Sequence, residues 1–175
     1  MKGYNMNGSI QVYYGSGRGK TTASLGLGIR AAGIGKRVIM VQFLKEKHSN
    51  TLELLKKLEP ELKIFRFEKA SENYEKLSSR EQEEQKVNIR NALNYAKKVM
   101  DTGQCDLLIL DDIFGLVDHQ IMDVEELIRM LNMKRASMSL ILTGRNLPEE
   151  IIGKADCIYK ITTEKEQPFD MILGK

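Results

Sequence analysis

The chain has 175 residues, 42% of them hydrophobic and 29% charged, which suits a single domain over residues 1–175 with a sizeable core. A net charge of +3 is too small to indicate nucleic acid binding, and no apolar run reaches the ~20 residues of a membrane span. The two cysteines, Cys105 and Cys157, do not form a Cys-x-x-Cys pair, so reduced thiols are favoured over a metal or redox site.

The first predicted elements are a strand, a glycine-rich loop and a helix. The apolar run Ile10–Tyr14 predicts the strand, and Lys20–Gly33 predicts a helix that packs through Ala23, Leu27, Ile29 and Ala31. Because this strand begins within about ten residues of Met1, we expect no signal peptide and a cytoplasmic protein.

The loop between these two elements has the composition of a phosphate-binding loop. Its glycines allow backbone N–H groups to point at phosphate oxygens, the lysine adds a mobile positive charge, and the hydroxyl that follows can ligate Mg²⁺. The strict pattern has a further glycine at the position of Tyr14, so the loop is a recognisable subtype. The residues expected to bind nucleotide here are Gly15, Ser16, Gly17, Arg18, Gly19, Lys20, Thr21 and Thr22.

Further along, strand-like runs alternate with helical patterns. Helices are expected over Thr51–Leu58, over Ser79–Met100 with a capping box at Ser79 and Gln82, and after Asp123, where Val124, Leu127, Ile128 and Leu131 form the apolar stripe. This alternation predicts an α/β fold with helices on both faces of a mostly parallel six-stranded sheet, and with the loop it indicates a three-layer, RecA-like phosphate-loop NTPase fold. The later strands are expected at Arg37–Phe43, Leu62–Phe67, Asp106–Leu110, Ser139–Leu142 and Cys157–Ile161.

Polar residues at the carboxyl ends of these strands are the next candidates for the site, since ligands bind at that edge of a parallel sheet. Asp111 and Asp112 follow a wholly apolar strand and would reach Mg²⁺ beside the phosphate loop. Arg145 would face nucleotide phosphate or substrate, or be a solvated turn residue. Gln42 would orient substrate, and Phe43 would wall a pocket or pack in the core.

Taken in order, several short motifs resemble the ATP:cob(I)alamin adenosyltransferases of the corrinoid-salvage type, over roughly residues 8 to 162. They are Gly15–Ala23, Arg30–Lys36, Val41-Gln42-Phe43, Leu110-Asp111-Asp112, Leu142–Arg145 and Ala155-Asp156. The resemblance implies transfer of the 5′-deoxyadenosyl group of ATP to the cobalt of a reduced corrinoid, with release of triphosphate. Cobalt(I) is then the nucleophile, and the protein supplies positioning and electrostatics.

The resemblance also implies roles for individual residues. Lys20 and the loop amides would stabilise the triphosphate leaving group, and Arg18 stands where the family has lysine. Thr21 would be an Mg²⁺ ligand, with Asp112 as its carboxylate partner at a position where the family usually has glutamate. ATP and Mg²⁺ are thus the expected cofactors, a homodimer the expected assembly, and a flavodoxin-type or flavin reductant a further expected partner.

Two departures from the family pattern concern the corrinoid. The segment Glu68–Tyr74 lacks the Phe-x-Trp pair found in many members, which leaves Tyr74 as the one aromatic candidate for a corrinoid contact or as a loop residue. Near the end, Pro168-Phe169-Asp170 is preceded by Glu166-Gln167 rather than by Lys-His. The histidines His48 and His119 are expected to be solvated loop residues.

Two other functions remain open at this stage. A phosphate-loop ATPase or kinase would use Asp111 or Asp112 to activate water or a hydroxyl and would produce ADP. A nucleotide-dependent corrinoid-binding or carrier protein would bind ATP without turnover.

Overall fold

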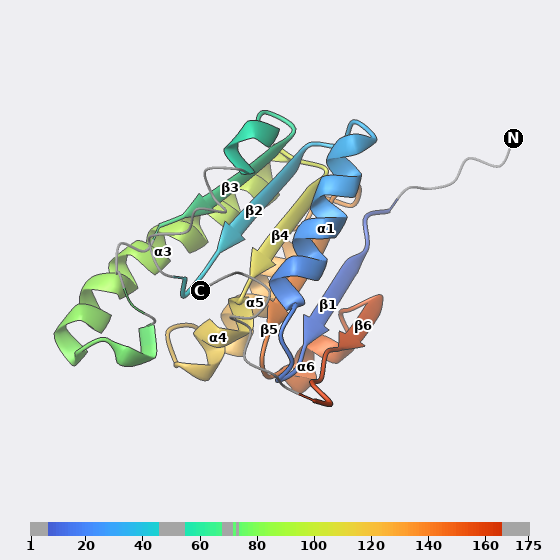
Figure 1. The fold of residues 1–175 in the computed structure, drawn as a ribbon. Coiled ribbons are helices and arrows are strands. Elements are labelled where there is room, and N and C mark those ends of the chain that lie inside the picture. Colours follow the sequence, from blue (N-terminus) through green and yellow to red (C-terminus); the bar gives the residue numbers. More distant parts are fainter. Residues whose placement is uncertain (1–6, 46–54, 68–71, 73, 166–175) are drawn as a thin grey trace, which may run out of the picture.

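The structure is a computed structural model that describes residues 7–45, 55–67, 72 and 74–165. Within this part of the chain, a six-stranded sheet forms the centre, with strand order β3-β2-β4-β5-β1-β6 and parallel pairing throughout (Figure 1). The strands are β1 Ile10–Tyr14, β2 Val38–Gln42, β3 Leu62–Arg66, β4 Leu107–Asp111, β5 Ser139–Gly144 and β6 Cys157–Lys160.

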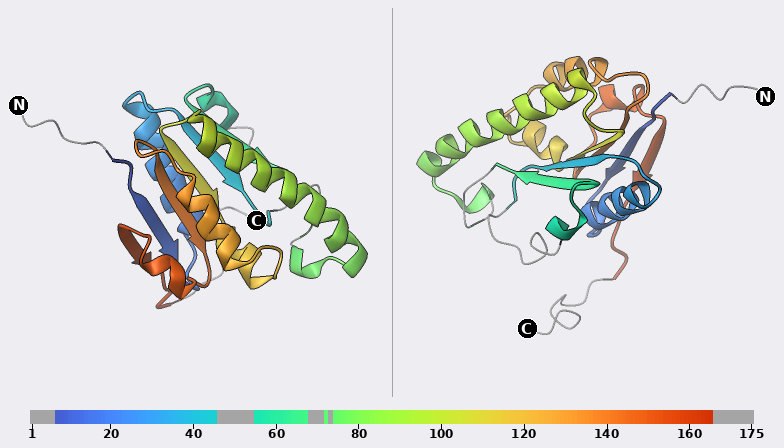
Figure 2. Two further views of the ribbon diagram at one scale, coloured as in Figure 1. Left: turned by 180° about the vertical axis from the view of Figure 1, so that it is seen from behind. Right: turned by 90° about the horizontal axis from the view of Figure 1, so that it is seen from above.

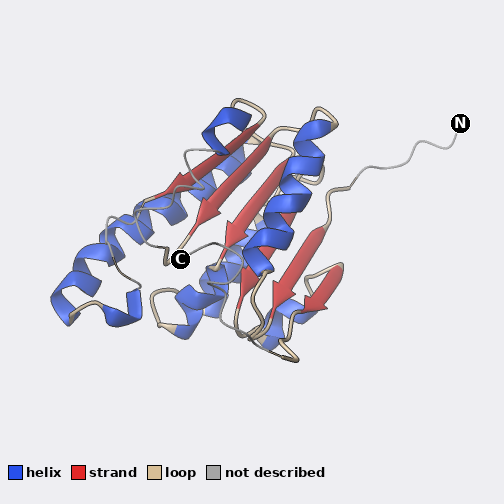
Figure 3. Cartoon of the chain, viewed as in Figure 1, coloured by secondary structure: helices blue, strands red, loops and turns tan. Residues whose placement is uncertain are grey.

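Helices lie on both faces of this sheet, as Figures 2 and 3 show. One face carries α1, which runs from the phosphate loop back along the sheet, and the other carries α3, α4 and α5. The helices are α1 Lys20–Gly33, α3 Ser79–Thr102, α4 Ile113–Asp118, α5 Val124–Asn132 and α6 Glu149–Ile152, with 3₁₀ turns η1 Lys56–Leu58 and η2 Tyr74–Lys76.

The alternation of side chains along each strand divides the core into two layers. In β4, Leu107 and Ile109 pack on the α1 side with Val38 and Met40 of β2. Leu108 and Leu110 face the other helices; together with residues of α3 such as Leu93, they form the larger apolar cluster. All five residues of β2 and of β4 are buried, as expected for central parallel strands covered on both faces.

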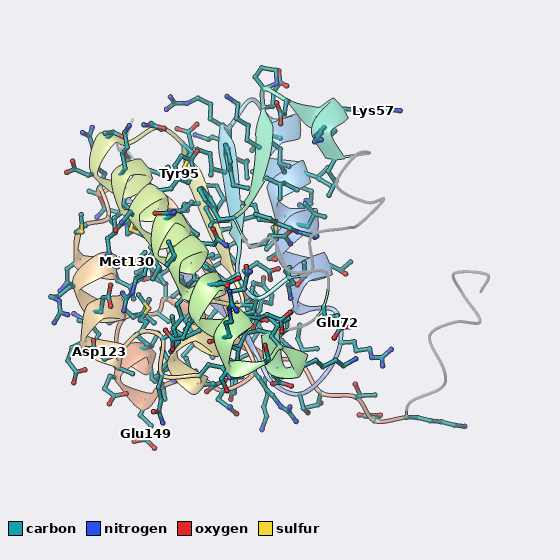
Figure 4. The ribbon with its side chains drawn as sticks, turned by 90° about the vertical axis from the view of Figure 1, so that its left-hand side faces the viewer. Lys57, Glu72, Tyr95, Asp123, Met130 and Glu149 are labelled. Carbon is teal, nitrogen blue, oxygen red and sulfur yellow. The ribbon has the colours of Figure 1, made fainter. Side chains whose placement is uncertain are left out.

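Side chains of α3 close the outer side of the larger layer. Tyr95, labelled in Figure 4, lies on this helix, and its ring centre is 4.7 Å from that of Phe65 on β3 and 5.7 Å from that of Phe67. The contact covers the edge strand β3 on the side of α3. No helix in the described ranges is both long and apolar enough to cross a membrane.

The predicted fold class is confirmed, and the six predicted strands occur within two residues of their expected bounds. Helix α3 begins at Ser79, as predicted, but the predicted capping box was wrong by one residue, since Ser78 is the N-cap and forms the box with Glu81. Ser78, one residue earlier, accepts the N–H of Glu81 and donates its own N–H to the Glu81 carboxylate.

The predicted apolar face of α1 was right for Leu27 and Ala31, which pack against the core on that side of the sheet, and wrong for Ile29. Ser24 and Gly28 are the buried residues, whereas Ile29 is 42% exposed. A Cβ at Gly28 would lie 3.0 Å from Ile109 Cδ1 and 3.2 Å from Leu62 Cδ1, so this glycine lets the helix approach the sheet closely. Hydrophobicity alone predicts that Ile29 rather than Gly28 faces the sheet. The close packing of the helix favours Gly28 there instead, because glycine has no side chain.

Other differences concern short elements. Helices α4 and α6 were not expected from the sequence. Of the helix expected at Thr51–Leu58, residues 51–54 lie outside the described part, and Lys56–Leu58 form a 3₁₀ turn. His48 and residues 166–175 also lie outside it, as do residues 68–71 and 73.

Candidate functional site

The loop between β1 and α1 is held in place by the strands on either side. Gly15 and Gly19 have φ values of 118° and 106°, which favour glycine. The N–H of Gly15 donates to the carbonyl of Arg145 after β5, and the N–H of Gly17 donates to the carbonyl of Ile161 after β6. A Cβ on Gly15 would lie only 2.4 Å from that Ile161 carbonyl oxygen. The loop therefore has a defined path that larger residues would disturb.

Lys20 begins α1 and folds back over this loop. Its Nζ donates to the carbonyl oxygens of Gly15 at 2.7 Å and Gly17 at 2.8 Å. Partial burial lowers the pKa of Lys20, an effect that Lys45 adds to and that Asp112 opposes. The ammonium is thus held at the mouth of the loop by neutral acceptors, which a phosphate can replace.

A pocket of about 430 Å³ opens beside the loop at the carboxyl ends of the strands. Of the predicted nucleotide-binding residues, all but Thr22 line it; Thr22 is exposed on α1. Three of its cationic side chains come from separate segments, namely α1, the end of β2 and the end of β5. The lining residues are Gly15, Ser16, Gly17, Arg18, Gly19, Lys20, Thr21, Lys45, Asp111, Asp112, Thr143 and Arg145.

Asp111 is the carboxylate that meets the loop. Its side chain is fully buried, and both of its oxygens accept the Thr21 hydroxyl at 2.9 Å. Thr143 Oγ1 donates to Oδ1 at 2.7 Å, and Gln42 Nε2 donates to Oδ2 at 3.0 Å. Lys45 Nζ is farther away, at 3.9 Å. The negative charge is therefore held mainly by neutral donors.

Asp112 faces a different partner. Lys45 Nζ lies 3.4 Å from its Oδ2, and its own N–H donates to Thr143 Oγ1 at 2.8 Å. Asp112 adopts a left-handed conformation, with φ 65°, immediately before α4. Burial raises the pKa of Asp112, which the positive charge of Lys45 counteracts and the neighbouring Asp111 reinforces. The two adjacent carboxylates thus differ, since Asp111 contacts Thr21 and Asp112 contacts Lys45.

The sequence interpretation paired Thr21 with Asp112, but the structure brings Thr21 to Asp111 instead. The side chains of neighbouring strand residues point to opposite faces, and Asp111 shares the α1 face with Ile109. Asp112 is already past the strand. This alternation, counted back from the apolar residues of β4, is a signal that distinguishes the two aspartates.

Other predicted residues are placed as follows. Gln42 is 4% exposed and contacts Asp111 rather than facing open space, and Phe43 is fully buried in the core, the second of its two expected roles. Arg145 lines the pocket. Sequence reasoning assigned no role to Lys45 or Thr143, although both stand at strand ends, which is the signal that pointed to the other candidates.

Tyr74 does not present an open aromatic surface. It is 7% exposed in the larger core cluster, and its ring centre is 5.3 Å from that of His119. His119 also lies 3.6 Å from Glu75 and is 29% exposed, so the histidine that was expected to be solvated is partly exposed. The contact between Tyr74 and His119 thus packs η2 against the end of α4. A packing role thus accounts for Tyr74.

The comparison with protein families matches residues 6–171 to the model described as ATP:corrinoid adenosyltransferase BtuR/CobO/CobP. A corrinoid adenosyltransferase of Escherichia coli K12 is 30% identical over 158 residues, which cover 90% of this chain and 78% of the relative. One from Salmonella typhimurium has the same identity and coverage. One from Pseudomonas aeruginosa is 22% identical, covering 90% of this chain and 76% of its own.

Proposed function

The chain belongs to the ATP:corrinoid adenosyltransferase family, and on that basis we propose that it transfers the 5′-deoxyadenosyl group of ATP to a reduced corrinoid at the pocket beside the phosphate loop. The observation that carries the proposal is the family match over residues 6–171, within which the loop and the carboxylates at the end of β4 meet at one pocket. Attack at the ribose 5′ carbon makes triphosphate the leaving group.

The pocket suits a departing triphosphate because cations surround it. Lys20, Lys45 and Arg145 line it, and we assign them to the phosphate oxygens. Cations placed in advance where negative charge develops stabilise the transition state more than the ground state. On this assignment Lys20 exchanges its bonds to the Gly15 and Gly17 carbonyls for phosphate oxygens.

The donors beside the loop fit a magnesium ion bound together with nucleotide. Thr21 and Asp111 bring a hydroxyl and a carboxylate within 2.9 Å of each other, and these hard oxygen ligands suit Mg²⁺. Among the described residues, no group of three or more His, Cys, Asp or Glu side chains gathers into a metal site. Mg²⁺ commonly takes one or two protein ligands and completes its shell with phosphate and water. When bound there, it would neutralise triphosphate charge.

We therefore assign Thr21 and Asp111 as the magnesium ligands, with Asp112 held beside them by Lys45. The loop residues from Gly15 to Gly19 are assigned to the phosphates. Thr22 does not line the pocket and is assigned to its rim. A homodimer, a cytoplasmic location and a flavodoxin-type or flavin reductant belong to the same proposal and derive from the family resemblance.

The test is an anaerobic assay with MgATP and chemically reduced cob(I)alamin, following the spectrum of adenosylcobalamin and identifying the phosphate product. We expect adenosylcobalamin and triphosphate in equal amounts. Lys20→Ala should reduce the rate by about 100-fold or more, as the loss of one stabilising group in a preorganised site does. ADP in place of triphosphate would overturn the proposal in favour of an ATPase or kinase, and ATP binding without product would favour a carrier.

A further inference from the structure

A row of polar side chains crosses the sheet at the carboxyl ends of its strands, on the face covered by α1. Arg66 of β3 pairs in register with Gln42 of β2, which pairs with Asp111 of β4. Thr143 of β5 continues the row through its bond to Asp111. Because residues in register in a parallel sheet point to the same face, the four side chains lie side by side.

The row of side chains two residues earlier in each strand, on the same face of the sheet, is entirely apolar. It consists of Ile64, Met40, Ile109 and Ile141, which pair in register across the same four strands. At Asp111 and Thr143 the polar row therefore lies between this apolar layer and the pocket. Any polar group in it needs a partner within the row or in the pocket, because an unpaired buried group costs roughly 1–3 kcal/mol.

Gln42 is the centre of this row, and its amide has one orientation that satisfies both neighbours. Arg66 Nε donates to Gln42 Oε1 at 2.7 Å, while Gln42 Nε2 donates to Asp111 Oδ2 at 3.0 Å. An arginine is a donor and never an acceptor, and an ionised carboxylate is only an acceptor. Reversing the amide would put oxygen against carboxylate and nitrogen against guanidinium. Arg66 and Asp111 thus favour the same orientation of the Gln42 amide, and Arg66 reinforces it from the outer end of the row.

Resting on the proposed function, we propose that Arg66 is a positioning residue that acts through Gln42 to hold the Asp111 carboxylate in the orientation that binds the magnesium ion of MgATP. Arg66 stands on the edge strand β3 and is partly exposed, two side chains from Asp111. Its positive charge also polarises the Gln42 amide, which strengthens the bond to Asp111. Partners of this kind orient metal ligands, and their loss commonly reduces metal affinity by about 10–100-fold.

The experiment measures how much Mg²⁺ is needed for ATP binding, by calorimetric titration of the protein with ATP at a series of Mg²⁺ concentrations. The variants are Gln42→Leu, Arg66→Met and the double variant. Arg37→Met is the matched control, because Arg37 pairs with Asp106 at the opposite end of the sheet. Thermal unfolding without Mg²⁺ is recorded for each, to separate loss of fold from loss of the cation.

We expect the half-saturating Mg²⁺ concentration to rise about 10-fold in Gln42→Leu and about 3- to 10-fold in Arg66→Met, with no change in Arg37→Met. The double variant should equal Gln42→Leu, because Arg66 acts through that amide. An Mg²⁺ requirement in Arg66→Met that equals wild type overturns the proposal. So does a double variant whose shift is the product of the two single shifts. Should Gln42→Leu not fold, the comparison of Arg66→Met with Arg37→Met decides.

This readout is independent of corrinoid chemistry. A shift in Arg66→Met without any adenosylcobalamin in the wild-type assay would overturn the proposed function and leave the role of Arg66 standing. Adenosylcobalamin formation by the wild type, with unchanged Mg²⁺ dependence in Arg66→Met, would support the proposed function and overturn the role of Arg66.

Discussion

At the carboxyl ends of the strands, Asp111 is fully buried and is held by the neutral donors Thr21, Gln42 and Thr143, whereas at the amino ends Asp106 is partly exposed and paired with Arg37. Asp106 accepts the Arg37 N–H at 2.8 Å and lies 3.5 Å from the guanidinium Nε. Its charge is thus compensated within the protein. The charge of Asp111 is oriented mainly by neutral donors, with Lys45 Nζ farther away at 3.9 Å, which leaves it available to a bound cation.

Both ends of the sheet also have a cavity, so a cavity alone does not identify the site. The one at the amino ends has a volume of about 360 Å³ and is lined by Lys36, Asp106 and several serines with apolar neighbours. Only the cavity at the carboxyl ends combines, within the described residues, a phosphate loop with a carboxylate that contacts it. Three aspartate-to-asparagine changes test this contrast, because each removes a charge and keeps the shape.

The largest effect is expected for Asp111→Asn. Asparagine places an NH₂ group opposite either Thr143 or Gln42, whose donors now bond to different oxygens of Asp111, so we expect the free energy of unfolding to fall by about 1–3 kcal/mol. The Mg²⁺ needed for ATP binding should rise by about 10–100-fold. Denaturant unfolding and a Mg²⁺ titration measure these changes. Unchanged Mg²⁺ dependence would show that Asp111 is not the ligand.

A smaller effect of opposite sign is expected for Asp112→Asn. Because the pKa of Asp112 is raised in the folded state, the protonated form contributes stability below the unfolded-state pKa of about 3.9, and this contribution is lost as pH rises through the folded pKa. The neutral asparagine, which tolerates the left-handed φ of 65°, should raise the free energy of unfolding at pH 7 by about 0.5–1 kcal/mol.

The control for Asp112→Asn is the same measurement near pH 3, where both side chains are neutral and the gain should disappear. A variant that is less stable than wild type at pH 7 would mean that the ion pair with Lys45 outweighs burial of the charge.

The smallest effect is expected for Asp106→Asn. The N–H of Arg37 lowers the pKa of Asp106, so its stabilising contribution is present above about pH 3.9 and is lost as pH falls through the lower folded pKa. Solvent screens this pair, and the cost at pH 7 should stay below about 0.5 kcal/mol. ATP binding should not change. A change in Mg²⁺ dependence here would contradict the distinction between the two ends of the sheet.

The sequence was sufficient for the strands, the loop and the family, because each depends on local pattern. Apolar runs of four to six residues ending in glycine or aspartate give β1 and β4 directly, and spacing identifies the loop. The partners of Gln42, in contrast, depend on which strands are neighbours. That order brings together residues 24 to 69 positions apart, and no local pattern contains it.

The same limit explains why Gly28 rather than Ile29 faces the sheet on α1, and it explains the role expected for Tyr74. Gly28 is buried because three side chains of separate strands meet there, and its own residue type predicts nothing of the kind. Tyr74 was a candidate for a corrinoid contact because it is the one aromatic residue of its segment. Its environment is decided instead by packing against His119, which is distant in the sequence.

Strand β5 lies between β1, which leads into the loop, and β4, which leads into the carboxylates. It works as a spacer, since parallel neighbours are about 4.8 Å apart and two such steps fix the span of the site. Thr143 is the residue of this spacer that bonds to both aspartates. One inserted residue in β5 would turn its side chains to the opposite faces and put a leucine or glycine in that place. The phosphate loop and the carboxylates would then both remain intact, yet no longer be linked as one site.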